Sequence, residues 1–185
     1  MSALALTAGA GLVGWFDGRA PLLRGVAMLL AVLGGLTLPD IDQWLWPLDH
    51  RDALTHSLLP AAVLASWRRL RAVAGGLALG LGLALHVSAD CFPDAMRGFA
   101  TVKLPFAGGI GGWSYWWLAV NAVIGSVGFG LALVDQPRWL QTGVSVAAAA
   151  IGLVYLATVD GGWWVLIMLA ALGWSSMQLL RLRRC

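Results

Sequence analysis

Seven long apolar runs make up most of this 185-residue chain, and only short polar segments separate them. A helix needs about 20 apolar residues to cross a bilayer, and the fourth, fifth and seventh runs have that length. The first, third and sixth are short and could be tilted, re-entrant or packed inside a bundle. The runs are Ala3–Phe16, Leu22–Leu38, Leu54–Trp67, Val73–Phe92, Trp113–Val134, Val144–Val159 and Trp163–Leu180.

The residues within these runs favour helices. Ala, Leu and Gly dominate, and no alternation of apolar and polar residues appears, which argues against a barrel. We therefore predict an all-α polytopic membrane bundle with about 5–7 spanning or membrane-embedded helices, forming a single integral-membrane domain over residues 1–185.

Composition excludes two broad classes of protein. The chain is 59% hydrophobic and 11% charged, which removes it from the soluble class. Its formal charge of +3 is scattered without a basic stripe, so we expect no nucleic-acid partner. Cys91 and Cys185 lie far apart in sequence and indicate little about the redox compartment. Met1–Phe16 lacks a positive segment before its apolar residues, so we expect a retained helix rather than a cleaved signal peptide.

The basic residues predict an orientation. If all seven runs cross, nine of the twelve Lys and Arg residues fall on one side, and the positive-inside rule makes that side cytoplasmic. The N-terminus would then face outward and the C-terminus inward. The outer interface would carry an aromatic belt of Trp44, Trp46, Trp113, Trp116, Trp163 and Trp164.

Ionisable residues gather where the apolar runs stop, and the same topology places them together on the outer side. Asp40 and Asp42 follow the second run, His56 opens the third, and His86 and Asp90 close the fourth. Carboxylates and imidazoles are ligands for zinc and similar divalent ions, and charges beside a membrane span are commonly functional.

Each of these motifs also has a structural interpretation. His86 and Asp90 are four residues apart and would share one helix face, but the histidine could simply bond to a neighbouring helix. Pro39 disfavours helix at Leu38, so we expect Asp40 and Asp42 in an extended turn with their side chains pointing the same way. That pair could equally be part of a solvated loop.

The segment before the third run contains further candidates. Thr55 or Ser57 can cap the following helix and so fix His56 at the membrane surface. His50 could be a metal ligand, a base behind the ligands or a surface residue. Arg51 could pair with Asp49 or Asp52, or bind a phosphate oxygen. The residues alone leave these alternatives open.

Four ordered motifs carry a family resemblance: LPDID, HRDALTHSLL, HVSADCFPDA and KLPF, together covering about Gly35 to Phe106. This set resembles the YdjM-like family of inner-membrane metal-dependent hydrolases, itself distantly similar to the zinc-dependent phospholipase C and single-strand nuclease superfamily. The resemblance implies a multi-pass protein of the bacterial inner membrane. It implies zinc ligands at Asp42, His56, His86 and Asp90. Asp40, which is paired with Asp42 in the Asp-x-Asp segment, is a further candidate ligand from the residues themselves.

The chain departs from the family at two places. Residues 1–16 contain no histidine, and Asp49 and Asp52 replace the glycines that usually flank the His-Arg pair. With three histidines in the whole chain, we expect one or two divalent ions, most readily zinc, rather than a trinuclear cluster.

These features predict a hydrolase at the outer face of the membrane that cleaves a lipid phosphoester. The ion would activate water, with Asp40, His50 or Asp94 taking its proton and Arg51, Arg97 or Lys103 neutralising a phosphate. Two alternatives remain. A metal-ion or proton transporter would place its site nearer the bilayer midplane, and a non-catalytic scaffold would use the polar cluster only to tie helices together.

Overall fold

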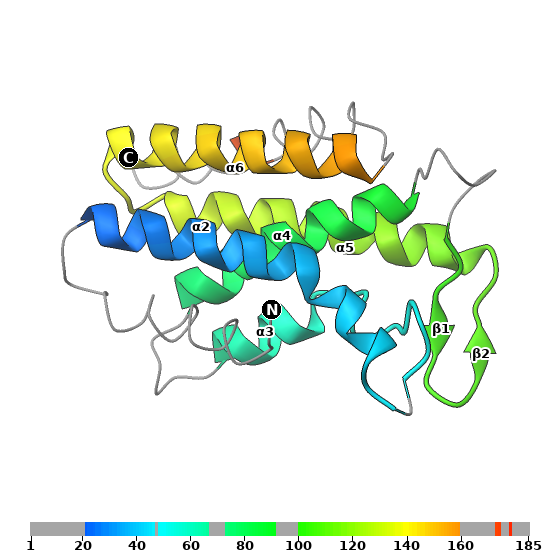
Figure 1. Cartoon of the computed structure of the whole chain (residues 1–185). Helices are drawn as coiled ribbons and strands as arrows, with labels where there is room; N and C mark the ends of the chain where they lie inside the picture. Colours follow the sequence, from blue (N-terminus) through cyan, green and yellow to red (C-terminus); the bar gives the residue numbers. More distant parts are fainter. Residues whose placement is uncertain are drawn as a thin grey trace.

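The computed structural model describes residues 21–46, 48–66, 73–91, 100–159, 173–174 and 178 of the chain. Within them the protein is mostly helical (Figure 1). The predicted helical bundle is thus confirmed for this part of the chain, with one small β-hairpin added. In chain order the elements are α2 (Pro21–Thr37), the 3-10 helix η1 (Pro39–Gln43), α3 (Leu59–Ser66), α4 (Val73–Cys91), β1 (Lys103–Leu104), β2 (Gly108–Gly109), α5 (Trp113–Leu133) and α6 (Arg138–Thr158).

Three of the described helices are long and apolar enough to cross a membrane: α4 over Ala74–Cys91, α5 and α6. Helix α2 is shorter, and α3 has only eight residues, well below the length of a span. The first apolar run lies outside the described residues, as does nearly all of the last. Membrane-compatible helices are therefore present, while the total of five to seven stays a prediction.

Helix α6 is longer than its apolar run suggested. It begins at Arg138 rather than near Val144, directly after Pro137, whose carbonyl accepts hydrogen bonds from the backbone N–H groups of Leu140 and Gln141. Proline is well suited to a helix start because its missing N–H would have no helical partner there. The first turn contains polar residues, so the pattern of apolar residues did not predict that the helix begins there.

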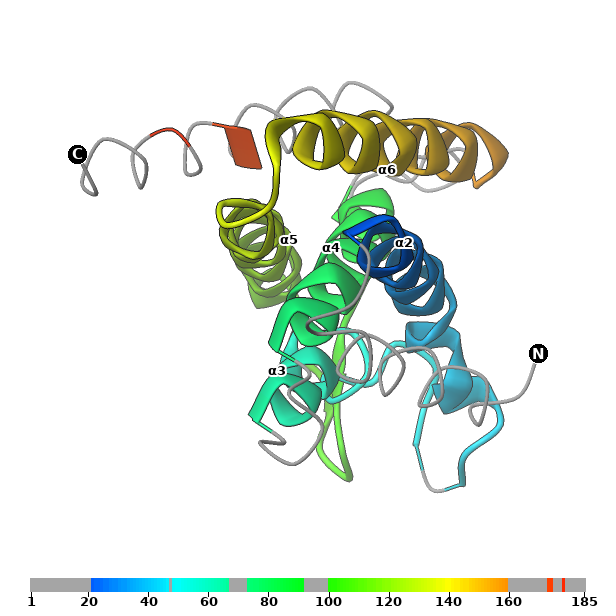
Figure 2. The same cartoon turned by 90° about the vertical axis from the view of Figure 1, so that its left-hand side faces the viewer.

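Helix α4 occupies the centre of the bundle and packs against α2, α3, α5 and α6 (Figure 2). Glycines permit its closest approaches. A Cβ atom on Gly82 would collide with the Val32 carbonyl of α2, and one on Gly125 would collide with the Gly80 carbonyl of α4. Small residues at such crossings let helix backbones touch, as in membrane bundles generally.

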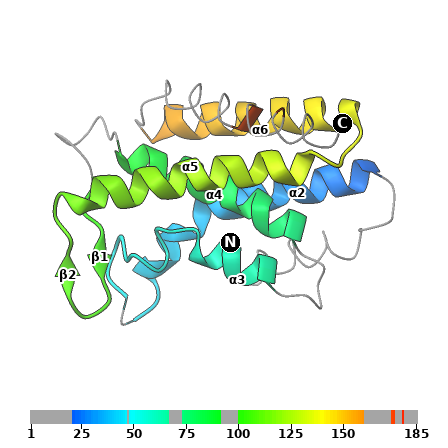
Figure 3. The same cartoon turned by 180° about the vertical axis from the view of Figure 1, so that it is seen from behind.

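The polar segments meet at one end of the bundle, where α2, α4 and α6 end and α5 begins. Strands β1 and β2 pair antiparallel there, and the segment after η1 lies beside them (Figure 3). The two are joined by backbone hydrogen bonds, from the Lys103 N–H to the Arg51 carbonyl at 2.9 Å and from the Ala53 N–H to the Lys103 carbonyl at 2.8 Å. This junction fixes the loop that carries the candidate site.

Two local expectations were wrong. The backbone does not become extended after Leu38. That residue keeps helical dihedrals of φ −64° and ψ −40°, and Asp40 and Asp42 lie in η1 rather than in an extended turn. Pro39 accounts for this, because proline at the first position of a helix stabilises it. Residue His56 does not open a helix either, since α3 begins at Leu59.

Candidate metal centre

A tight turn holds His56 in place. The backbone carbonyl of Asp52 accepts hydrogen bonds from the backbone N–H groups of Thr55 and His56. The side-chain Oδ1 atom of Asp52 accepts another from the Leu54 N–H. Aspartate favours such turns because its side chain bonds to the backbone two residues on. The His56 carbonyl in turn accepts a hydrogen bond from the Trp117 indole N–H at 3.0 Å. The turn is thereby attached to α5.

The imidazole of His56 lies between two carboxylates. Its Nδ1 atom is 3.3 Å from Asp42 Oδ2 and 3.2 Å from the Thr55 hydroxyl, and its Nε2 atom is 3.5 Å from Asp90 Oδ2. Asp42 Oδ2 also accepts hydrogen bonds from the Asp52 N–H and the Thr55 hydroxyl, both at 3.1 Å. A carboxylate facing Nδ1 favours the proton there, which leaves the Nε2 lone pair directed at Asp90.

His86 reaches the same point from α4. Its Nδ1 atom lies 2.9 Å from the Leu36 carbonyl and 2.8 Å from the Tyr155 hydroxyl, and its Nε2 atom lies 3.9 Å from Asp90 Oδ2. The predicted pairing of His86 and Asp90 on one helix face is thus present. The His56 and His86 rings meet edge to face with centroids 5.2 Å apart.

His56, His86 and Asp90 can each supply one ligand atom, and these three atoms all lie within 4.8 Å of one another. Bonds of about 2.1 Å at tetrahedral angles separate two zinc ligands by about 3.4 Å, close to the 3.5 Å between His56 Nε2 and Asp90 Oδ2. Both of those atoms are buried, and within the described part of the chain neither has a hydrogen-bond partner. A divalent cation would satisfy both, so the donor set fits zinc or a similar ion.

Burial controls the protonation of this cluster. His56 is fully buried, and desolvation lowers the pKa of its imidazole to about 3, assisted by the neighbouring His86 and opposed by the Asp42 carboxylate. The ring is therefore neutral at physiological pH, the form that binds metal. The side chain of Asp90 keeps 14% of its surface exposed, although its Oδ2 atom is buried.

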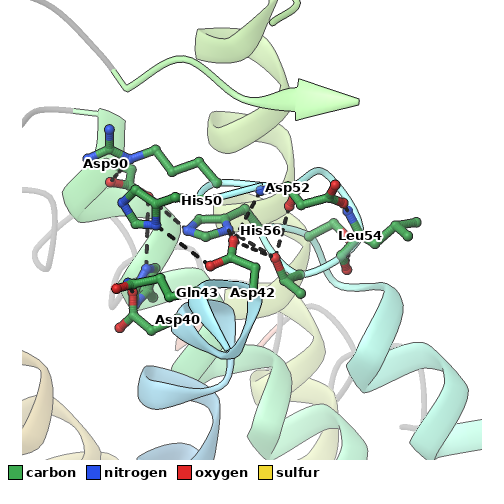
Figure 4. Close-up of polar contacts among 12 residues, drawn as sticks. Asp40, Asp42, Gln43, His50, Asp52, Leu54, His56 and Asp90 are labelled. Atoms are coloured by element: carbon green, nitrogen blue, oxygen red, sulfur yellow. Dashed lines mark hydrogen bonds and ion pairs between the residues drawn. The ribbon is translucent and has the colours of Figure 1, made fainter. Parts of the chain in front are cut away.

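Of the other predicted residues, His50 and Asp40 lie beside this group (Figure 4). His50 Nδ1 lies 3.6 Å from Asp42 Oδ1, and half of its side chain is exposed. Asp40 is half-buried, and its Oδ1 atom accepts a hydrogen bond from the Gln43 amide. Lys103 pairs with the exposed Asp49 at 3.8 Å. Asp94 and Arg97 lie outside the described residues.

Arg51 adopts a strained backbone conformation beside the cluster. Its φ of 65° is rare for a residue with a side chain, and the hydrogen bonds to Lys103 hold it there. Its Nε atom approaches Asp90 Oδ1 at 3.4 Å. Of the alternatives open from the sequence, pairing with Asp49 or Asp52 is thus replaced by pairing with Asp90.

Sequence reasoning missed several contributors. Thr55 bonds to the Asp42 carboxylate rather than capping α3, while the Ser57 hydroxyl does accept the Leu59 N–H at 3.2 Å. The Asn121 side chain accepts the Leu58 N–H at 2.8 Å. Tyr155 contacts His86 from α6. The available signal for Tyr155 and Asn121 was the rarity of polar side chains inside their apolar runs.

No family model, curated protein sequence or solved structure matches the chain in the three comparisons made.

Proposed function

We propose that this protein is a membrane-embedded, metal-dependent hydrolase with His56, His86 and Asp90 as the ligands of a divalent ion, zinc being the best fit. The observation that carries the proposal is a pair of buried atoms, His56 Nε2 and Asp90 Oδ2, which have no hydrogen-bond partner among the described residues and face each other at a ligand-to-ligand distance. Three protein ligands with the fourth position left to water are typical of catalytic zinc sites, whereas structural sites are closed by a fourth protein ligand.

Asp42 takes a supporting role in this proposal. The sequence resemblance implies that it is a direct ligand, but its Oδ2 atom faces the Nδ1 atom of His56, the nitrogen that points away from Asp90. A carboxylate in this position orients a ligating histidine and raises its basicity. A second ion near Asp42 Oδ1 and His50, 3.6 Å apart, is compatible with the earlier expectation of one or two ions.

The proposed chemistry is water attack on a phosphoester. A bound divalent ion would lower the pKa of water towards about 7 and polarise the phosphoryl oxygen. Asp40, on the same turn as Asp42, is half-buried and would take the proton from water, with His50 as the other candidate base. Asp94 is a further candidate base predicted from the sequence alone.

Arg51 would bind the substrate phosphate. Its guanidinium already lies against Asp90, so a phosphoryl oxygen near Asp90 would be within its reach. Lys103 could contribute a second positive charge, because its present partner is an exposed carboxylate and such pairs are weak. Arg97 is a further candidate for phosphate binding, predicted from the sequence alone.

A membrane lipid or lipid-linked phosphoester is the proposed substrate class. The site lies at the end of the bundle where the candidate spans α4 and α6 end and α5 begins. Trp46 and Phe106 project from the adjoining segments with more than nine-tenths of their surface exposed, as side chains at a membrane interface commonly do. We further propose that the protein lies in the bacterial inner membrane with its site at the outer face, and that it is related to the YdjM-like family.

The test is hydrolysis by metal-loaded, detergent-solubilised protein of a panel of phospholipids and polyprenyl phosphates, with and without a chelator. We expect chelator-sensitive turnover. Asp40→Asn should retain metal and reduce turnover by about 10²-fold or more, because the amide cannot accept the proton. Arg51→Ala should chiefly raise KM, by roughly tenfold.

Asp49→Asn serves as the matched control, because Asp49 is an exposed aspartate of the same loop and its change, which at most frees Lys103, should not reduce turnover. Absence of chelator-sensitive turnover across the whole panel, in protein shown to hold metal, would favour the non-catalytic scaffold instead.

A further inference from the structure

We propose that Tyr155 is a positioning residue for the metal site, acting through His86. The inference rests on the proposed function, since it takes His86 as a ligand. Tyr155 belongs to α6 and is 69 positions from His86 in sequence, yet its hydroxyl lies 2.8 Å from His86 Nδ1 and the two rings lie 5.9 Å apart, tilted by 31°.

The hydrogen bonds at His86 Nδ1 decide which nitrogen carries the proton. Among the described residues this atom has two hydrogen-bond neighbours, the Leu36 carbonyl at 2.9 Å and the Tyr155 hydroxyl at 2.8 Å. A carbonyl can only accept, so Nδ1 must carry a proton to satisfy Leu36. The Nδ1–H group is then shared between the carbonyl and the tyrosine oxygen, and the lone pair remains on Nε2, facing Asp90.

The Leu36 carbonyl and the Tyr155 hydroxyl, which belong to different helices, also fix the plane of the His86 ring. Leu36 is at the end of α2 and Tyr155 is near the end of α6, so His86 on α4 is held from two neighbouring helices. Such partners behind a metal ligand typically change metal affinity by about 10–100-fold when removed. Helix α6 therefore contributes to a site whose sequence motifs all lie between about Gly35 and Phe106.

The experiment uses the small number of histidines and tyrosines in the chain. With three histidines, ¹⁵N labelling of histidine gives three imidazole pairs, and the His86→Gln variant identifies one of them. In metal-free wild-type protein we expect His86 to be protonated at Nδ1 and bare at Nε2. An unprotonated Nδ1 in that spectrum would overturn the inference without any variant at Tyr155.

Tyr155→Phe should then shift the Nδ1 resonance of His86 while leaving that of His50 unchanged, and it should weaken metal binding by about tenfold or more in competition with a chelator. Tyr115→Phe is the matched control, because Tyr115 is the other tyrosine of the chain, and it should change neither readout. Equal metal affinity and an unmoved His86 resonance in folded Tyr155→Phe protein would overturn the inference.

The two proposals fail in different ways. Wild-type protein that binds no metal would overturn the proposed function, and the metal-free spectra would still decide whether Tyr155 and Leu36 set the His86 tautomer. Wild-type protein that binds metal no more tightly than Tyr155→Phe protein would overturn only the role of Tyr155.

Discussion

The Nε2 atom of His56 lies 3.5 Å from the Oδ2 atom of Asp90, and neither buried atom has a hydrogen-bond partner in the described part of the chain. A buried polar atom without a partner normally costs about 1–3 kcal/mol, so two facing each other require an explanation. A shared cation would explain the pair, because one ion would both neutralise the Asp90 carboxylate and bind the lone pair of the His56 imidazole.

The orienting role of Asp42 gives the first prediction. Asp42→Asn keeps the shape of the side chain but removes the charge that faces His56 Nδ1, so we expect metal affinity to fall by about 10–100-fold without complete loss of the ion. Chelator competition on purified protein measures this. Asp49→Asn removes an exposed charge of the same loop and should leave the affinity unchanged. Equal affinities in the two variants would contradict the assignment.

The buried imidazole of His56 predicts a pH dependence of stability. Its pKa falls from 6.5 to about 3 on folding, chiefly through desolvation. Between these values the unfolded chain binds a proton that the folded chain excludes, so acidification destabilises the fold. Metal-free protein should therefore unfold at a lower temperature near pH 5 than near pH 7, with the loss beginning below about pH 6.5.

Two histidine variants provide the control for that measurement. His56→Gln should flatten the pH dependence, whereas His50→Gln should preserve it because His56 and the burial that lowers its pKa remain. A slope that is the same in His56→Gln as in the wild type would show that another group titrates.

The packing of α2 against α4 gives a third prediction. A Cβ atom on Gly82 would meet the backbone of Val32 and Gly35, which cannot move aside as a side chain can. Gly82→Ala should therefore lower the unfolding temperature sharply or prevent assembly. Gly143→Ala on α6 is the matched control, since none of the other described segments has an atom within 4 Å of the added carbon. Thermal unfolding in detergent compares them, and equal transitions would contradict this packing.

The membrane topology is a fourth prediction and is testable in cells. Reporter fusions after Arg71 and after Phe106 should report opposite sides, cytoplasmic and external respectively, because the predicted span α4 lies between them. If both fusions report the same side, α4 does not cross and the outward placement of the site is wrong.

Much of the architecture followed from the pattern of apolar runs. Helix α5 lies within one residue of its predicted bounds at each end, and α2 ends one residue before its predicted end, because a long apolar run between polar segments specifies a helix in a membrane-like environment. The convergence of Asp42, His56, His86 and Asp90 was also predictable. It required only that the polar ends of successive apolar runs meet on one side.

The remainder depends on tertiary contacts that no local pattern encodes. Local rules at Pro39 pointed to an extended turn, whereas the chain continues into η1 and gives Asp40 and Asp42 different surroundings. Whether Asp42 or Asp90 is proposed as a metal ligand depends on which nitrogen of His56 each carboxylate faces. The contribution of Tyr155 depends on how α6 crosses the bundle, which spacing along the chain does not reveal.

The most direct measurement is the metal content of the purified protein, determined by elemental analysis for the wild type and for the combined His56→Ala and His86→Ala variant. We predict stoichiometric divalent metal in the wild type, with zinc foremost, and its loss in the double variant, while His50→Ala retains at least one ion. Stoichiometric metal surviving in the folded double variant, or wild-type protein that takes up no divalent ion, would contradict the metal centre described here.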